Sequence, residues 1–261
     1  MTENAPEIRA AEELVEALSG AGRIVVLTGA GMSAESGVPT FRGADGLWEK
    51  YRAEDLATPE AFRADPTLVW RWYDWRRTLI AKLRPNPGHE ALARWETLFP
   101  DFTIVTQNVD GLHSGAGSKN VLELHGNIWK VRCTRERTIH ENREAPLATL
   151  PPKCPDCGEL LRPHIVWFGE SLDPDVIGRA FRLSETCDLM LVVGTSAIVY
   201  PAASLPSVAA AAGAKVIEVN PDATPLTAQS HLSLRGTAAK ILGAADLILR
   251  NRKTPRSGDD R

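Results

Sequence analysis

An uninterrupted apolar stretch at residues 23–28 (RIVVLT) runs directly into a glycine-rich segment at residues 29–34 (GAGMSA). A run of this length and composition is typical of a strand buried on both faces of a parallel sheet. The segment after it fits the G-x-G-x-x-G/A pattern, whose glycines permit a tight turn and close approach of the backbone to a pyrophosphate. The pattern alone is weak, and a plain tight turn is the alternative. With the strand before it, we predict a phosphate-binding turn.

Three further apolar runs have strand length and the same near-uniform character. They occupy residues 102–106 (FTIVT), 188–193 (DLMLVV) and 215–219 (KVIEV). A helical apolar pattern from Ile8 to Leu18 precedes the first strand, and alanine-rich helical segments separate the later ones. Strands that alternate with helices predict an α/β fold with a Rossmann-like doubly wound parallel sheet.

The helix that should follow the glycine-rich turn is expected to end early. Gly37 and Pro39 come only a few residues after its start. A dehydrogenase of this fold continues with a full helix and a second strand that ends in Asp or Glu. No such strand follows here, which counts against hydride transfer.

Two stretches do not follow the alternation of strand and helix. Residues 45–83 contain no clear strand, but Thr58-Pro59 and Asp65-Pro66 each predict a helix start, the second for a helix over 66–83. Residues 128–164 are expected to be irregular, with three cysteines and several prolines. We predict a Rossmann-like domain made of residues 1–44, 84–127 and 169–250, a small domain made of residues 45–83 and 128–168, and a disordered tail at 251–261.

Composition narrows the class of partner. The chain has 30 Lys and Arg against 33 Asp and Glu, a net charge of -3, so no basic excess suggests nucleic-acid binding. No apolar run has the length of a membrane span. The N-terminus lacks the layout of a signal peptide, so a cytoplasmic location is expected. The oligomeric state stays open.

Polar loops follow the other predicted strands. Gln107, Asn108 and Asp110 lie in TQNVDGLH, His125 lies in LELHGN, and GTSAIVYP begins at Gly194. The loops beyond the carboxyl ends of parallel strands face the ligand crevice. Asn and Asp also favour turns for their own sake, and a lone His is more often structural than catalytic. Taken together, the loops indicate a nucleotide site.

The sequence resembles the sirtuins, the NAD-dependent protein lysine deacylases. The segments GAGMSAESGVPTFRG, TQNVDGLH, ELHG, the cysteine cluster, HIVWFGE and GTSAIVYPAA occur in the sirtuin order, over roughly residues 22–248. The resemblance implies a cleft between a Rossmann-like domain and a small zinc-bearing domain, in which NAD meets an acyl-lysine. Nicotinamide leaves, and the acyl group ends on ADP-ribose.

The resemblance also implies residue roles. His125 is the general base, and Asn108 and Asp110 lie at the ribose and nicotinamide pocket. The other cofactor-binding residues are Gly29, Ala30, Gly31, Ser33, Phe41, Arg42, Gln107, Gly194, Thr195, Ser196 and Asn220. Val166 and Phe168 flank the acyl-lysine tunnel, and Phe168, Gly169 and Glu170 pair with the substrate backbone as an added strand. His89, His113 and His164 match no catalytic position.

Tyr73 and Arg76 are three residues apart on the helix predicted at 66–83, so they share one side of it. A Tyr-x-x-Arg at this place resembles the sirtuin subclass that removes acidic acyl groups. A guanidinium binds a distal carboxylate through two bonds, and the Tyr hydroxyl adds a third. The alternative is a surface Arg paired with Asp74 or a neighbouring acid. We predict removal of succinyl and malonyl groups, with some deacetylation retained.

The cysteines predict a metal site that lacks one ligand. Structural zinc sites usually show two C-x-x-C pairs. Cys154 and Cys157 form one pair, but the partner of Cys133 is replaced by Glu136. Glu136, His140 or water completes the tetrahedron, or the site has lost its zinc. The resemblance implies a structural zinc, and Cys187 is interpreted as core packing.

The leading hypothesis is a deacylase acting on acylated lysines of cytosolic proteins. An ADP-ribosyltransferase or NAD glycohydrolase would use the same site. A dehydrogenase is opposed by the missing second strand, and a non-catalytic NAD sensor by the set of His125, Asn108 and Asp110, which exceeds what binding needs.

Overall fold

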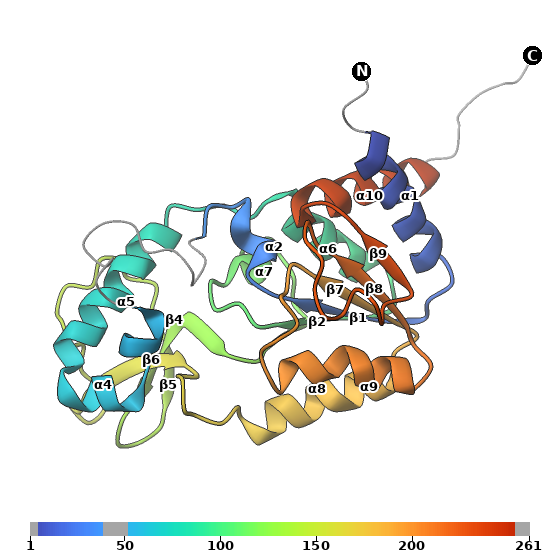
Figure 1. Cartoon of the computed structure of the whole chain (residues 1–261). Helices are drawn as coiled ribbons and strands as arrows, with labels where there is room; N and C mark the ends of the chain where they lie inside the picture. Colours follow the sequence, from blue (N-terminus) through green and yellow to red (C-terminus); the bar gives the residue numbers. More distant parts are fainter. Residues whose placement is uncertain (1–4, 39–51, 254–261) are drawn as a thin grey trace, which may run out of the picture.

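The computed structural model describes residues 5–38 and 52–253, which form a six-stranded sheet between helices and, beside it, a small three-stranded sheet with its own helices (Figure 1). The six strands lie in the order β3-β2-β1-β7-β8-β9, and every neighbouring pair is parallel. This is the order of a doubly wound dinucleotide-binding sheet, so the predicted fold class is confirmed. The strands are β1 (Arg23–Thr28), β2 (Asp101–Thr106), β3 (Val121–Glu123), β7 (Leu189–Val193), β8 (Lys215–Val219) and β9 (Leu232–Leu234).

Helices cover both faces of this sheet because its strands are apolar on both faces. Ile24 and Val26 of β1 pack in one core with α1, α6 and α10, whereas Val25 and Leu27 pack in another with α8 and α9. Burial on two sides explains the near-uniform apolar runs. The helices are α1 (Ala5–Leu18), α6 (Pro87–Leu98), α8 (Pro174–Thr186), the 3-10 turn η2 (Ala202–Ser204), α9 (Leu205–Ala211) and α10 (Ala238–Lys253).

The small module contains three helices, and side chains cap the starts of the last two. They are α3 (Ala53–Leu56), α4 (Pro59–Ala64) and α5 (Pro66–Ile80). The Thr58 hydroxyl accepts a hydrogen bond from the Ala61 N–H at 3.0 Å, and Asp65 accepts one from Leu68 at 2.9 Å. Both predicted helix starts are therefore confirmed, although α5 ends at Ile80 rather than at residue 83.

The prediction that residues 128–164 are irregular is wrong for much of that range. They contribute most of an antiparallel sheet of β4 (Gly126–Cys133), β5 (Ile139–Glu141) and β6 (Leu161–Ile165), in the order β5-β4-β6. Val131 and Cys133 are buried while Lys130 and Arg132 are less so, which is the period-two pattern of a half-buried strand. The same alternation can be read in WKVRC. It was overlooked because the prolines and cysteines nearby favour an irregular segment.

The chain ends only partly match expectation. Helix α10 continues to Lys253, so the first three residues of the tail predicted to be disordered are helical. Residues 254–261 lie outside the described residues, as does the predicted domain boundary at residue 44. Among the helices of the described ranges, none has the length and apolarity that crossing a bilayer requires.

Arg77 joins α5 to the small sheet from inside the core. Its guanidinium donates to the carbonyl oxygens of Ile128 at 3.0 Å, Asn142 at 2.7 Å and Glu144 at 2.9 Å, and its side chain is 1% exposed. Burial lowers the pKa of Arg77 to about 10. This side chain therefore ties three backbone carbonyl groups together, of which that of Ile128 is buried.

Replacing Arg77 by methionine should lower the free energy of unfolding by about 3 kcal/mol, because one buried and two partly buried carbonyl groups lose a charged donor. Chemical denaturation followed by tryptophan fluorescence measures the change. Arg71→Met is the control, because Arg71 is exposed on the same helix, and its effect should stay within about 0.5 kcal/mol. Equal stability of the two variants would show that the buried contacts contribute little.

Candidate functional site

The loops after β1 and β7 meet at the point where the strand order of the large sheet reverses. Gly31 donates its N–H to the Gly194 carbonyl at 2.8 Å. A Cβ atom on Gly31 would lie 2.7 Å from the Gly194 Cα, and one on Gly194 would lie 2.5 Å from the backbone of Gly31. Contacts this short exclude any side chain. The glycines are thus required by close approach of two backbones at the ligand crevice of the fold.

The helix after this turn is as short as predicted. Helix α2 (Gly31–Ala34) has four residues, and Gly37 has a φ of +86°, a left-handed conformation that favours glycine. Phe41 and Arg42, predicted to cover the cofactor, lie outside the described residues. Ala30 and Ser196 are exposed at the rim of the crevice.

Side chains from the strand-end loops connect to one another across the crevice. The Asn108 amide donates to the Gly29 carbonyl at 2.9 Å and to the Ser33 hydroxyl at 3.2 Å. Gln107 donates to the Thr195 hydroxyl at 3.1 Å, and the Asn220 amide donates to the Thr195 carbonyl at 2.9 Å. The structure thus brings together these predicted cofactor-binding residues.

A buried histidine that the sequence analysis set aside orients this site. The Asn86 N–H donates to Nδ1 of His89 at 3.3 Å, so Nε2 of His89 carries the proton, and it lies 3.3 Å from the Ser33 hydroxyl. Ser33 therefore accepts from His89 and directs its own hydrogen to the Asp110 carboxylate. Burial raises the pKa of Asp110, which this hydrogen bond and the Leu112 N–H oppose.

His89 and His113 lie against each other in the core, with ring centroids 4.9 Å apart. Nε2 of His113 lies 3.0 Å from the Thr28 hydroxyl. Burial lowers the pKa of His89 to about 4 and that of His113 to about 3. Both rings are therefore neutral in the folded protein across the physiological range.

These two histidines predict a loss of stability in mild acid. Below the ordinary His pKa of about 6.5, the unfolded chain binds protons that the folded protein refuses. The free energy of unfolding should fall between pH 6.5 and about 4, by roughly 1.4 kcal/mol per pH unit for each ring. Urea denaturation at a series of pH values measures this slope. His113→Asn should reduce the slope by one ring's share, and an unchanged slope would assign the acid sensitivity to other groups.

His125 lies where the chain passes from the large sheet to the small one. Strand β3 ends at Glu123 and β4 begins at Gly126. The His125 carbonyl accepts the Val166 N–H at 3.0 Å, which ties it to the end of β6. Gly126 has a φ of +80°, and a Cβ there would lie 2.2 Å from the His164 oxygen. The glycine of ELHG is therefore required for the turn that presents His125.

The ring of His125 is held in one tautomer. Nδ1 lies 2.9 Å from the Gln107 carbonyl, which can only accept, so Nδ1 carries the proton and Nε2 is left to accept one. Burial lowers the pKa of His125, and the hydrogen bond to Gln107 opposes this. The side chain is only half-buried. His125 is thus a neutral base that a substrate can reach.

Tyr73 and Arg76 lie on the side of α5 that faces the crevice. The Tyr73 hydroxyl accepts from Nε1 of Trp167 at 2.9 Å, and burial raises the pKa of Tyr73 to about 12, so its own hydrogen remains available to donate. Burial lowers the pKa of Arg76, while the nearby Tyr73 and Asp110 oppose that shift. The carboxylate of Asp74 instead accepts the Leu147 N–H at 2.8 Å. Asp74 is thus engaged with the backbone, and the acyl-pocket role of Tyr73 and Arg76 stays a prediction.

The segment after β6 forms a braced turn. Arg162 makes two hydrogen bonds to the Glu170 carboxylate, at 2.6 and 2.8 Å, and Glu170 also accepts the Trp167 N–H at 2.9 Å. Phe168 is 49% exposed, and its N–H donates to the Ala57 carbonyl at 2.9 Å. The Glu170 side chain therefore stabilises the turn, whereas Phe168 and Gly169 stay accessible.

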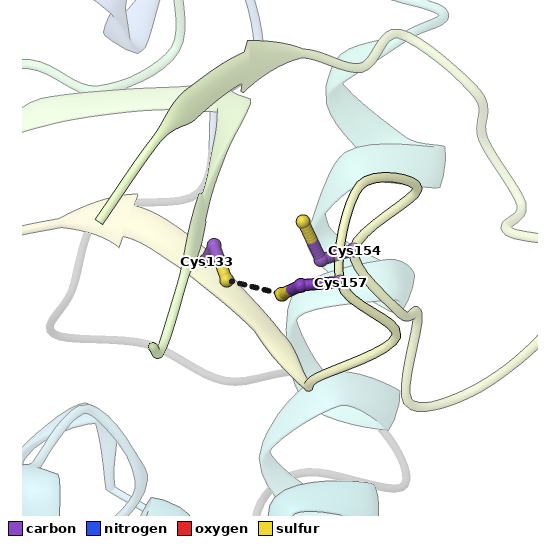
Figure 2. Close-up of side chains that lie close together, drawn as sticks. All are labelled: Cys133, Cys154 and Cys157. Atoms are coloured by element: carbon purple, nitrogen blue, oxygen red, sulfur yellow. Dashed lines mark hydrogen bonds between the residues drawn. The ribbon is translucent and has the colours of Figure 1, made fainter. Parts of the chain in front are cut away.

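Three cysteines converge between β4 and the loop that precedes β6 (Figure 2). The ligand atoms of Cys133, Cys154 and Cys157 all lie within 4.8 Å of one another. Cys187 is separate: its thiol is packed in the core under α8, and burial raises its pKa to about 11. The three clustered thiols fit a tetrahedral metal with one further ligand.

Several supporting residues have weak sequence signals. Asn86-Pro87 carries the same helix-start pattern as Thr58-Pro59, and Asn86 does cap α6, so that pattern predicts the element that carries His89. Nothing local connects His89 to Ser33, which is 56 positions away. Arg162 and Trp167 lie in or beside a recognised motif, but their bracing role follows only from the fold.

The fold and these residues define a class: a dinucleotide-binding sheet whose crevice adjoins a small cysteine-bearing module and a reachable neutral histidine. A family model described as Sir2 family matches residues 29–201. The chain belongs to the Sir2 family. The six motifs identified in the sequence lie within or beside that range.

Named relatives and solved structures agree with this membership. An NAD-dependent protein deacylase of Aquifex aeolicus is 58% identical over 83% of this chain and 90% of its own length. NAD-dependent protein deacylase 1 of Archaeoglobus fulgidus is 51% identical over 88% and 94%. A Sir2 homologue in complex with NAD superposes with a TM-score of 0.87 at 49% identity, covering 92% of this chain and 94% of that one. A Sir2 enzyme with a deacetylated p53 peptide and 3′-O-acetyl ADP-ribose gives 0.80 at 33% identity, covering 92% and 97%.

Proposed function

We propose that this chain is an NAD-dependent protein lysine deacylase, which transfers the acyl group of an acyl-lysine to ADP-ribose and releases nicotinamide. The observation that carries the proposal is the single free acceptor nitrogen of His125 beside the crevice at the strand ends. Relatives named NAD-dependent protein deacylase, at 51–58% identity, support it.

The residues of the crevice have different roles according to their positions. The glycine turns at Gly31 and Gly194 admit the pyrophosphate of NAD, the substrate that supplies the ribosyl carbon. Asn108 and Asp110, fixed through Ser33, orient the nicotinamide end. Nε2 of His125 accepts a proton from the ribose hydroxyls as the acyl group moves. Val166 and Phe168 flank the lysine, and the substrate adds as a strand along Phe168, Gly169 and Glu170.

We propose an acidic acyl group as the preferred cargo. Arg76 and the protonated hydroxyl of Tyr73 would together give a carboxylate three donors. An acetyl group would leave this guanidinium without that partner, so succinyl and malonyl groups are favoured. The proposed substrates are acylated lysines of cytosolic proteins, and the cysteines, which are free in the described residues, fit a reducing compartment.

One assay tests the reaction and its cargo. Matched acetyl-, succinyl- and malonyl-lysine peptides are incubated with NAD and followed by mass spectrometry. Free lysine peptide, nicotinamide and acylated ADP-ribose should appear in equal amounts, fastest for the acidic acyl groups. Addition of ADP-ribose to protein would instead identify a transferase, and nicotinamide release without an acyl peptide would identify a glycohydrolase.

A further inference from the structure

The thiol cluster has the local geometry of a metal site that is already built. The Glu136 N–H donates to the Cys133 sulfur at 3.3 Å, and the sulfurs of Cys133 and Cys157 are 3.4 Å apart. Backbone N–H groups turned toward sulfur favour the thiolate form that binds zinc. Figure 2 shows Cys133 on its strand facing the loop that carries Cys154 and Cys157. Three ligands are therefore in place, and the fourth is either a residue of another type or water.

Glu136 occupies the position of the missing cysteine, but its carboxylate is used elsewhere. It pairs with Nε of Arg135 at 3.0 Å, and its side chain is 50% exposed. Only its backbone N–H is turned toward the cluster. The residue that replaces the cysteine in sequence thus supports the Cys133 sulfur through its main chain and directs its side chain to an ion pair.

His140 lies at the other side of the same cluster. A ring nitrogen of His140, the Cys154 sulfur and an Asp156 oxygen lie within 4.8 Å of one another, so this group shares Cys154 with the three thiols. In the antiparallel pairing of β5 with β4, His140 is opposite Val131. Directly opposed residues point to the same face of a sheet, and Cys133 is two residues from Val131, so His140 and Cys133 share that face.

Asp156 is placed to orient the imidazole. Its carboxylate lies 3.6 Å from Nε2 of His140, and the Thr138 hydroxyl lies 3.1 Å from the same nitrogen. Metal-binding histidines commonly use their second nitrogen in such a contact, which fixes the ring. His140 is also only partly exposed, at 30%, whereas Asp156 is 61% exposed.

We propose that His140 is the fourth ligand of a structural Cys3His zinc site formed with Cys133, Cys154 and Cys157, and that Asp156 positions its ring. Binding displaces the three thiol protons and leaves the site with one net negative charge. Arg135, which donates to the Cys157 carbonyl at 3.3 Å, supplies a compensating positive charge.

Metal binding by the full chain tests this inference without reference to deacylation. Zn²⁺ affinity is measured by competition with a chromophoric chelator for the unchanged protein and for His140→Ala, Glu136→Ala and Asp156→Asn. His140→Ala should weaken binding more than the roughly 10-fold to 100-fold typical of losing an outer partner, Asp156→Asn should fall within that range, and Glu136→Ala should bind as the unchanged protein does. X-ray absorption of the zinc-loaded protein should show three sulfur neighbours and one imidazole nitrogen.

His140→Cys is the control for the possibility that His140→Ala loses zinc because it misfolds. It should retain zinc and, with Co²⁺, show stronger thiolate charge-transfer absorption, because a fourth sulfur replaces the nitrogen. If Glu136→Ala weakens zinc binding and His140→Ala leaves it unchanged, the Glu136 carboxylate is the fourth ligand and the inference is overturned. Unchanged affinity in every variant would assign the position to water, and absence of stoichiometric zinc binding by the unchanged protein would overturn the site itself.

Discussion

Replacing His125 by alanine should lower the rate of deacylation by about 10²- to 10⁴-fold, the usual contribution of a general base. The Gln107 carbonyl holds the proton on Nδ1, so no other nitrogen of this ring can take the role of Nε2. The rate is measured with a saturating acyl-lysine peptide and NAD. Binding of ADP-ribose should be nearly unchanged, because the glycine turns that admit it do not involve this side chain.

His164→Ala is the matched control for that variant. His164 is also half-buried and burial also lowers its pKa, but it lies on β6 outside the ELHG motif. Its loss should leave the rate within a few-fold of the unchanged enzyme. Since burial lowers the pKa of His125 below its ordinary value, the rate should be constant above about pH 6.5 and fall only in more acid solution, where the base becomes protonated. An acid limb above that pH, or one that persists in His125→Ala, would contradict the assignment.

Replacing Arg76 by methionine should lower kcat/KM for a succinyl-lysine peptide by about 10²- to 10⁴-fold. The substrate carboxylate would lose two charged hydrogen bonds, each of about 1.5–3 kcal/mol. Activity on the acetyl-lysine peptide should stay within a few-fold, since that substrate has no carboxylate to bind. Kinetics on the two peptides in parallel give the ratio of kcat/KM for succinyl-lysine to that for acetyl-lysine. This ratio shows whether Arg76 selects the acyl group.

Two further variants sharpen this result. Tyr73→Phe removes only the third donor, so it should reduce desuccinylation less than Arg76→Met. Arg71→Met removes a cation from the exposed side of the same helix and should change neither activity. Equal losses on both peptides in Arg76→Met would show that Arg76 supports the site as a whole and does not select the acyl group.

The large sheet was predictable because its strands are buried on both faces and therefore leave long apolar runs such as RIVVLT. Parallel strands also bring their carboxyl ends to one edge, so Asn108, Thr195 and Asn220 could be placed together before any coordinates. The small sheet was missed because its strands alternate between buried and less buried residues and leave no continuous apolar run, and because prolines and cysteines lie among them. His89 was missed because it is connected to the site through a contact with Ser33. The two residues are far apart in the sequence, and no local pattern links them.

The passage from β3 to β4 places His125 on the joint between two sheets. Its ring is anchored to the large sheet through Gln107, and its main chain is anchored to the small sheet through Val166. The position of Nε2 of His125 therefore depends on the angle between the two modules. Substitutions far from the crevice that change how the modules meet should therefore lower the rate of acyl transfer before they weaken the binding of NAD.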